Sequence, residues 1–494
     1  MTHRFLFAGI LVVGALLRLS GLGRESLWQD ESWTWYLVHD SLGDLLHRLI
    51  LSDAHPPLYF LLLWPWVKLG DSETLLRLPS ALLGIASLPL LYRLGRSLAG
   101  AREGLVAMAF LAVSPFHVMY SQEARSYSLL FFLCLLSLDL LVAVRERPGD
   151  RRRWAALAVV TAAIIYTEYL GVFFILGEMA LALAWGQRDR GFSRGCLLAS
   201  AAAFALFIPW IPTAFGHVTH VGQGFWLPKP VPAVLGMELS RMIVYPHGVT
   251  ATIESAGSPG LAIGVLAAAL PAIGMVALGL GAARLSRRPE LAPWVWATIV
   301  PILTMGVTGF FISIFCARGL IYVLAPLLAL AAVGATALPG WTGRLSIAAG
   351  LLCALPGLAS IHGSLHKENW RAAAGFLRLH VAPGELVIVD EGFLDVNLRY
   401  YWRDRGTIEV LPVEGAIEEV VARARGNSRV WVARRVYPER TDPPRVLAGT
   451  SLERLWHVRE TWRARTDLEN RLGSEFPRRE EWRWQDVGLL RFSR

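Results

Sequence analysis

The chain has 494 residues, of which 54% are hydrophobic and only 18% are charged, whereas soluble globular proteins average about 25% charged residues. The charge is unevenly spread, because residues 362–494 hold 43 of the 87 charged side chains. This composition excludes a soluble enzyme, a disordered protein and a fibrous protein. It predicts a mainly α, polytopic membrane protein over residues 1–361, followed by a soluble domain over residues 362–494.

The net charge and the cysteines exclude further classes of protein. The charge of +9 comes almost entirely from arginine, and no basic stretch is interleaved with aromatic residues as in a nucleic-acid-binding groove. All four cysteines lie within apolar stretches, where cysteine packs as a small hydrophobic residue. These are Cys134, Cys196, Cys316 and Cys353. We therefore expect no nucleic-acid partner, no disulfide framework and no thiolate metal site.

Apolar runs of about 17–25 residues predict membrane-spanning helices. The first run, Phe5–Leu22, follows a short basic N-terminus and has no small-residue cleavage site after it, so we interpret it as a retained anchor. Pro56–Leu69 extends over only about 21 Å as a helix, and we expect it to enter the membrane without completing a span. Full runs lie near 74–95, 103–120, 127–144, 154–169, 171–186, 195–215, 259–282, 293–315, 318–336 and 342–360. Together they predict about 11 full crossings, within a fold of about 11–13 transmembrane helices.

Arginine-rich connectors set the expected orientation, because positive charge stays on the cytoplasmic side. They are Arg93–Arg102, Arg145–Arg153, Arg188–Arg194 and Arg284–Arg288. The N-terminus then lies inside. The segments expected outside are residues 23–55, 121–126, 166–170 and 216–258 and the C-terminal domain.

The C-terminal region alternates between helical and strand patterns. The expected helices are Trp370–Leu379, Leu394–Trp402 and Ile417–Arg425, and the expected strands are Leu386–Asp390, Thr407–Leu411 and Arg429–Ala433. Such alternation predicts a small α/β layer. The sequence shows no Gly-rich phosphate loop and no nucleophile elbow in this domain, and no internal repeat stands out in the chain.

Ionisable residues at the edge of a membrane are costly and therefore indicate function. The outer segment Leu27–Ser32 has two adjacent carboxylates, Asp30 and Glu31. Adjacent carboxylates repel each other, which raises the pKa of one and makes it a better proton acceptor. The alternative is that both residues cap a surface helix that continues through Tyr36.

Two further outer segments contain candidate ligands for a phosphate. His55 can bind a phosphate, a metal or a carboxylate, or it can make a purely structural hydrogen bond. Arg125 has a planar guanidinium that matches phosphate oxygens. Its alternative role is an interfacial ion pair with Glu123.

Two more segments complete the outer set. Glu168 lies between Tyr166 and Tyr169, and an aromatic belt explains the tyrosines but not the carboxylate. Arg318 lies near the outer end of a late span with Tyr322 one turn later, and snorkelling to the interface is the alternative explanation. Carboxylates and arginines on one membrane face suit a reaction on an anionic lipid-linked substrate, in which arginines hold a phosphate leaving group.

The order of these motifs resembles the protein O-mannosyltransferase-like family of membrane glycosyltransferases (GT-C fold, glycosyltransferase family 39, ArnT-like). The matching motifs are Trp28-x-Asp30-Glu31, His55-Pro56-Pro57-Leu58, Arg77–Gly84, Ser114-Pro115-x-His117, Gln122–Tyr127, Tyr166–Tyr169 and Asn369-Trp370-Arg371. The resemblance covers the membrane part fairly continuously and the C-terminal domain only loosely.

The resemblance implies an inverting hexosyl- or pentosyltransferase with a polyprenyl-phosphate sugar as donor. In that role Asp30 and Glu31 are the catalytic carboxylates, with Asp30 as the general base, while Arg125 and Arg318 stabilise the departing lipid phosphate. The remaining candidates would line the pocket. They are His55, Glu123, Tyr127, Glu168, Tyr169 and Tyr322.

The resemblance further implies a bacterial inner membrane location and an acceptor hydroxyl on a protein, lipid or polysaccharide. No metal site is assigned, although the resemblance also implies that the acidic pair Asp30–Glu31 could hold a divalent metal, as in related oligosaccharyltransferases. Two alternatives stay open, a transporter or flippase of lipid-linked sugars and a ligase of lipid-linked glycans. A transporter usually has charges near the bilayer midplane and often an internal repeat, whereas a ligase usually places its reactive residues in a large late outer loop.

Overall fold

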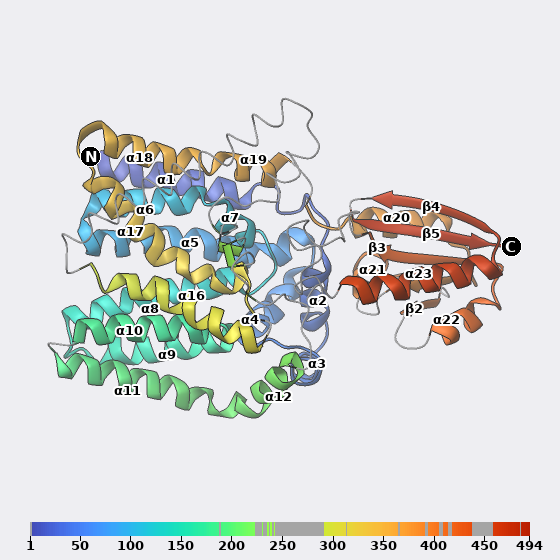
Figure 1. Cartoon of the computed structure of the whole chain (residues 1–494), viewed down its shortest axis with the longest axis horizontal. Helices are drawn as coiled ribbons and strands as arrows, with labels where there is room; N and C mark the ends of the chain where they lie inside the picture. Colours follow the sequence, from blue (N-terminus) through green and yellow to red (C-terminus); the bar gives the residue numbers. More distant parts are fainter. Residues whose placement is uncertain are drawn as a thin grey trace. The chain divides into compact units, whose positions relative to one another are not determined.

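The chain is described here by a computed structural model that is mostly helical (Figure 1). The structure describes residues 2–186, 189–222, 230, 235–236, 238–239, 242, 291–312, 314–363, 366–390, 394–404, 409–412, 417–436, 458–484 and 486–494. The predicted span 259–282 and most of the predicted outer loop 216–258 lie outside these residues.

The chain forms two compact units. The membrane unit comprises residues 1–22, 42–70 and 74–364, and the C-terminal unit comprises residues 23–41, 71–73 and 365–494. The sequence placed the boundary near 361 and assigned residues 23–41 to the membrane part. In the structure this early segment folds with the C-terminal domain instead.

Helices make up the membrane unit and run alongside one another (Figure 1). In the first half of the unit they are α1 (Thr2–Leu19), α3 (Leu42–Leu51), α4 (Leu58–Trp66), η1 (Val67–Leu69), α5 (Glu73–Ala99), α6 (Ala101–Val113), α7 (Pro115–Ser121), α8 (Tyr127–Glu146) and α9 (Arg151–Thr167). In the second half they are α10 (Gly171–Gly186), α11 (Arg190–Phe207), η2 (Ile208–Trp210), α12 (Ile211–Gly222), α16 (Trp294–Phe311), η3 (Ala317–Val323), α17 (Leu324–Ala337), α18 (Gly340–Leu352) and α19 (Leu355–Gly363).

Six stretches of described helix are long and apolar enough to cross a membrane, or seven if the bent pair α6–α7 counts as one span. They are Glu73–Ala99, Tyr127–Glu146, Arg190–Thr219, Trp294–Phe311, Ala317–Ala337 and Gly340–Gly363. The number is below the expected 11 partly because only helices of at least 18 residues are counted. Two predicted spans form shorter helices, α9 with 17 residues and α10 with 16 residues. Pro56–Leu69 contains only a short apolar helix, as expected.

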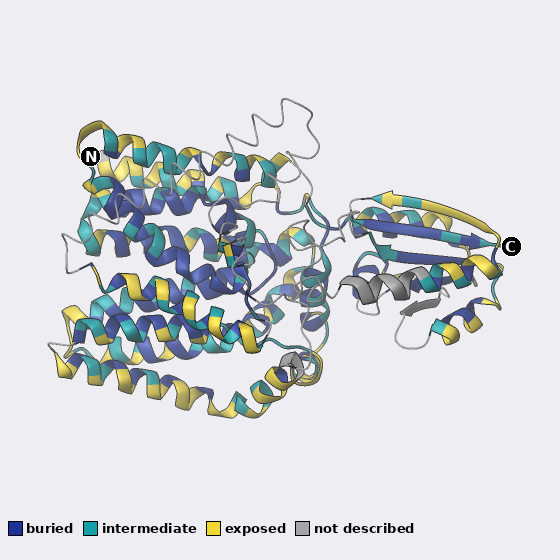
Figure 2. Cartoon of the chain, in the orientation of Figure 1, coloured by how far each residue is buried: buried dark blue, intermediate teal, exposed yellow. Residues whose placement is uncertain are grey.

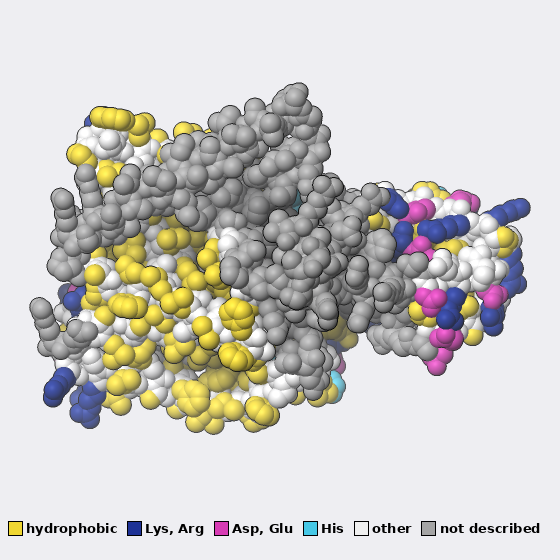
Figure 3. Space-filling view, viewed as in Figure 1, with side chains coloured by type: hydrophobic (Ala, Val, Ile, Leu, Met, Phe, Trp, Pro, Cys, Tyr) yellow, Lys and Arg dark blue, Asp and Glu magenta, His cyan; other side chains and the backbone are white. Residues whose placement is uncertain are grey.

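The outward faces of these helices are apolar. Figure 2 shows exposed residues along α11 and buried residues along α5, and Figure 3 shows hydrophobic side chains spread over the visible face of the unit. Leu197, Leu198 and Phe204 on α11 are each more than half exposed. A surface of this kind matches hydrocarbon rather than water, and the chain is a multi-pass membrane protein.

A proline breaks the predicted span 103–120 into α6 and α7, which meet at an angle of 61°. Pro115 has no N–H group to donate to the carbonyl of Leu111, four residues earlier. The guanidinium of the fully buried Arg18 donates to that carbonyl at 2.9 Å and to the Ala112 carbonyl at 3.0 Å. The break is therefore stabilised by a charged side chain from α1.

The C-terminal unit is a three-layer α/β/α domain around a five-stranded sheet of order β2-β1-β3-β5-β4 (Figure 1). Its elements are α2 (Gln29–Val38), α20 (Trp370–His380), β1 (Leu386–Val389), α21 (Asp395–Tyr401), β2 (Glu409–Pro412), α22 (Ile417–Ala424), β3 (Arg429–Arg435), α23 (Val458–Glu475), β4 (Arg478–Trp484) and β5 (Val487–Ser493). β1 pairs in parallel with β2 and β3, while β5 is antiparallel to β3 and β4.

Alternating strand residues build one core on each face of this sheet. Val387 and Val389 of β1 pack with Trp370 of α20 on one face. Leu386 and Ile388 pack with α22 and α23 on the other face. All three predicted helices and all three predicted strands of this domain are confirmed within a few residues, but α23, β4 and β5 were not predicted.

Candidate functional site

Three polar residues of the membrane unit form a connected chain. The Nδ1 atom of His55 lies 2.7 Å from an Asp53 carboxylate oxygen, and its Nε2 atom lies 2.9 Å from the Arg125 guanidinium. A guanidinium has only donors, so Nε2 accepts this bond and the imidazole proton is on Nδ1, which donates to Asp53.

The loop between α7 and α8 holds Arg125, which is only 4% exposed. The Ser80 hydroxyl donates to its carbonyl at 3.3 Å. Just before it, the Gln122 side-chain amide donates to the carbonyls of Leu17, Arg18 and Ser20 at the end of α1. The loop is thus held by hydrogen bonds at Arg125 itself and at Gln122, three residues earlier.

A second group surrounds the turn between α9 and α10. Ser126, next to Arg125, donates to the buried Glu168 carboxylate at 3.4 Å. Tyr169 accepts a hydrogen bond from Trp210 at 2.9 Å and lies 3.0 Å from Nδ1 of His217. Burial, with smaller contributions from the charges of Glu168 and Asp53, raises the pKa of Tyr169 to about 12, so its hydroxyl stays protonated at neutral pH.

The remaining predicted site residues make different kinds of contact. The Arg318 guanidinium lies over the Tyr127 ring, 5.8 Å from its centre, and Glu123 is buried in the loop that precedes Tyr127. Tyr322 is fully buried, and its hydroxyl donates to the Leu170 carbonyl at 3.0 Å. That bond gives Tyr322 a structural role.

Asp53, Trp210 and His217 were not selected from the sequence. Asp53 lies two residues before His55. A carboxylate so close in sequence could have been predicted as a hydrogen-bond partner of the imidazole. Trp210 and His217 reach Tyr169 across more than 40 residues of sequence, so the sequence offered no local signal for them.

The acidic motif lies in the C-terminal unit, in the first turn of α2. Its N-cap residue is Trp28, which makes no side-chain capping bond, so neither carboxylate caps the helix as the alternative interpretation required. Glu31 is fully buried and forms an ion pair with Lys367 at 3.0 Å. Asp30 is partly exposed.

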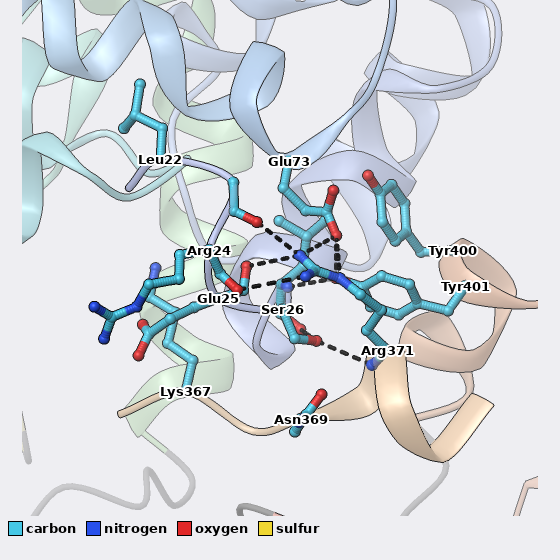
Figure 4. Close-up of polar contacts among 12 residues, drawn as sticks. Leu22, Arg24, Glu25, Ser26, Glu73, Lys367, Asn369, Arg371, Tyr400 and Tyr401 are labelled. Carbon is cyan, nitrogen blue, oxygen red and sulfur yellow. Dashed lines mark hydrogen bonds and ion pairs between the residues drawn. The ribbon is translucent and has the colours of Figure 1, made fainter. Parts of the chain in front are cut away.

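Arg371 of α20 holds the segment that leads into this motif (Figure 4). Its guanidinium donates to the backbone carbonyls of Gly23, Arg24 and Glu25 at 3.0 to 3.4 Å and to the Glu73 carboxylate at 2.7 Å. The same carboxylate accepts from the hydroxyl of Tyr401. One side chain therefore binds two segments that are far apart in sequence.

A second arginine reaches the motif from the sheet. Arg435, the last residue of β3, contacts the side-chain oxygen of Gln29 and pairs with Glu368 at 2.7 Å. Burial raises the pKa of Glu368, and the charge of Asp30 adds to this effect while Arg435 opposes it. The motif thus lies at the carboxyl end of a parallel strand, where open α/β sheets usually bind ligands.

Metal ligands around the acidic motif were sought among the residues that the structure describes. Among the described residues, no three His, Cys, Asp or Glu side chains come together in a way that could hold a metal ion. Asp30 and Glu31 supply only two carboxylates, and the second is paired with Lys367.

Residues 54–212 match the family model for dolichyl-phosphate-mannose-protein mannosyltransferase. Among solved structures, the chain is similar to the Archaeoglobus fulgidus oligosaccharyltransferase in complex with zinc and sulfate, with 14% identity and a TM-score of 0.53 over 87% of this chain and 68% of that chain. It therefore has a GT-C fold. AglB from the same organism, in complex with an inhibitory peptide and a dolichol-phosphate, matches with 12% identity and a TM-score of 0.53 over 87% of this chain and 69% of that chain.

ArnT from Cupriavidus metallidurans matches over 99% of this chain and 97% of that chain, with 13% identity and a TM-score of 0.48. No curated protein sequence matches the chain. The family match includes His55, Arg125 and Glu168 and confirms the predicted resemblance over that stretch.

Replacing Arg371 with alanine should destabilise the C-terminal unit by about 1 kcal/mol, because three backbone carbonyls and a carboxylate lose a charged donor, whose half-exposed position lets water weaken each contact. Thermal unfolding of the full chain in detergent measures the effect. Arg378→Ala is the control, since Arg378 is exposed on the same helix. Equal unfolding temperatures for the two variants would contradict the role given to Arg371.

Proposed function

We propose that this chain is an inverting glycosyltransferase that moves a sugar from a polyprenyl-phosphate carrier to an acceptor hydroxyl on the outer face of the membrane. The observation that carries the proposal is the buried Arg125 guanidinium, bonded to the imidazole of His55, within a stretch that matches a family of lipid-phosphate-dependent mannosyltransferases.

The reaction would be a single displacement. The acceptor oxygen attacks the anomeric carbon from the side opposite the phosphate, and the bond between that carbon and the phosphate oxygen breaks. The electron pair of this bond leaves with the polyprenyl phosphate, whose charge Arg125 and Arg318 would stabilise. The acceptor proton passes to a carboxylate, and the configuration at the sugar inverts.

Asp30 is better suited than Glu31 to take that proton. Glu31 is fully buried and paired with Lys367, and an adjacent cation makes a carboxylate a weaker base. Asp30 is partly exposed, so an acceptor hydroxyl could reach its carboxylate.

The proposal specifies the sugar and the acceptor by chemical class. The donor is a hexose or pentose on a polyprenyl phosphate, and the acceptor is a protein, lipid or polysaccharide hydroxyl. The proposed location is a bacterial inner membrane, with the N-terminus in the cytoplasm and the C-terminal unit outside. The arginine-rich connectors support this orientation.

Asp30→Asn should lower sugar transfer at least about 100-fold, because it removes the proton acceptor with little change in shape. The variant is expressed in a host that lacks the gene, and polyprenyl-phosphate lipids are measured by mass spectrometry. The glycosylated carrier should accumulate in the cells that express Asp30→Asn. Wild type and Asp40→Asn, a change at an exposed residue of the same unit, should both clear it. Clearance by Asp30→Asn as well would disprove the role of Asp30.

Arg125→Ala should weaken donor binding about tenfold to a hundredfold, since a bidentate partner of the phosphate is lost. Titration with a polyprenyl phosphate measures this loss, and acceptor affinity should change far less. Arg102→Ala, at an exposed residue of a connector, is the control. An equal loss of donor and acceptor binding would point to a general structural defect instead.

Protease added to intact spheroplasts should cleave the C-terminal unit, because the proposed orientation places it outside the membrane. Immunodetection of an N-terminal tag follows the cleavage. A chain that is cut only after lysis would reverse the orientation.

A further inference from the structure

We propose that Lys367 is a positioning residue for the reaction: its ion pair with Glu31 fixes the first turn of α2 so that the neighbouring Asp30 is presented to the acceptor. In this view Glu31 orients Asp30 and does not itself take the proton. The inference rests on the proposed glycosyltransferase function and assigns a role in it to the C-terminal unit.

The ion pair is buried on both sides. The Glu31 side chain is 0% exposed and the Lys367 side chain 13% exposed, and Nζ lies 3.0 Å from the carboxylate. A carboxylate buried in this way without a cation is strongly disfavoured in its charged form. Lys367 therefore keeps Glu31 charged and keeps it inside.

The segment around Lys367 is itself held from several directions. The amide of His366 donates to the Glu25 carboxylate at 2.5 Å. Glu368 pairs with Arg435 and accepts from the Trp370 indole at 2.7 Å. The backbone of Lys367 is thus held in place. Because a lysine side chain is long and flexible, a fixed backbone is needed for its ammonium group to keep one position against α2.

The helix transmits this constraint to Asp30. Successive residues of an α-helix point about 100° apart, so fixing the inward direction of Glu31 also fixes the direction of Asp30. The backbone carbonyl of Asp30 accepts a bond from the buried Thr34 hydroxyl at 3.0 Å. A side chain one turn later thus holds the backbone of the residue that would take the proton.

The pair of variants Lys367→Met and Glu31→Gln/Lys367→Met separates positioning from chemistry. The single variant leaves a buried carboxylate without its cation, and it should lower kcat by about tenfold or more while the donor KM stays near its wild-type value. The double variant removes the ion pair without leaving a buried unpaired charge, so its unfolding temperature should stay near the wild-type value while its kcat stays about tenfold below wild type. A wild-type kcat in the double variant would contradict the role of the ion pair. Lys68→Met, at an exposed lysine of the membrane unit, is the control for loss of a lysine.

Two outcomes would overturn the inference. Wild-type kcat in Lys367→Met would show that the pair has no effect on Asp30. A double variant as inactive as Asp30→Asn, with a wild-type unfolding temperature, would show that the Glu31 carboxylate is needed for the chemistry itself. If the wild-type protein transfers no sugar from any polyprenyl-phosphate donor, the proposed function itself is wrong. This outcome is distinguished from the two above because they require an active wild type.

Discussion

Every polar backbone group in an apolar surrounding needs a partner, and in this protein charged or amide side chains from distant segments supply several of them. Arg18 of α1 satisfies carbonyls at the break between α6 and α7, and Gln122 just after that break satisfies carbonyls at the end of α1. Each of the two segments therefore supplies hydrogen-bond donors for the backbone carbonyls of the other. This reciprocal arrangement fixes the start of the loop that contains Arg125, on which the proposed donor site depends.

The same kind of interaction explains why the early outer segment folds with the C-terminal unit. Arg371 donates to three consecutive carbonyls of residues 23–25, and Lys367 and Arg435 bind α2 directly. As a consequence, the proposed proton acceptor Asp30 is part of the C-terminal unit.

Much of the fold follows from local sequence patterns, while the rest depends on long-range contacts. Apolar runs identified α5, α8 and α17, and buried strand patterns identified β1 and β3, because burial on both faces leaves a continuous apolar signal. β4 was missed because its charged, exposed residues give no such signal. The bend at Pro115 was predictable in principle, since a proline cannot continue the hydrogen bonding of a helix.

For the candidate site, residue types were easier to predict than their partners. The sequence selected His55 and Arg125 separately, but their direct bond joins residues 70 positions apart. The pairing of Glu31 with Lys367 joins residues 336 positions apart, which no local pattern encodes. The different surroundings of Asp30 and Glu31 could not be read from two adjacent carboxylates.

The contacts of Arg18 have a consequence for biosynthesis. Its oxygen acceptors on Leu111 and Ala112 and its nitrogen partner on His117 follow it by 93 to 99 residues, which a ribosome adds in about 5–20 s. During that interval α1 already contains an arginine without these partners, and a charge inside a bilayer is costly. Until α6 and α7 are made, we expect the Arg18 end of α1 to stay at the membrane surface or beside another protein.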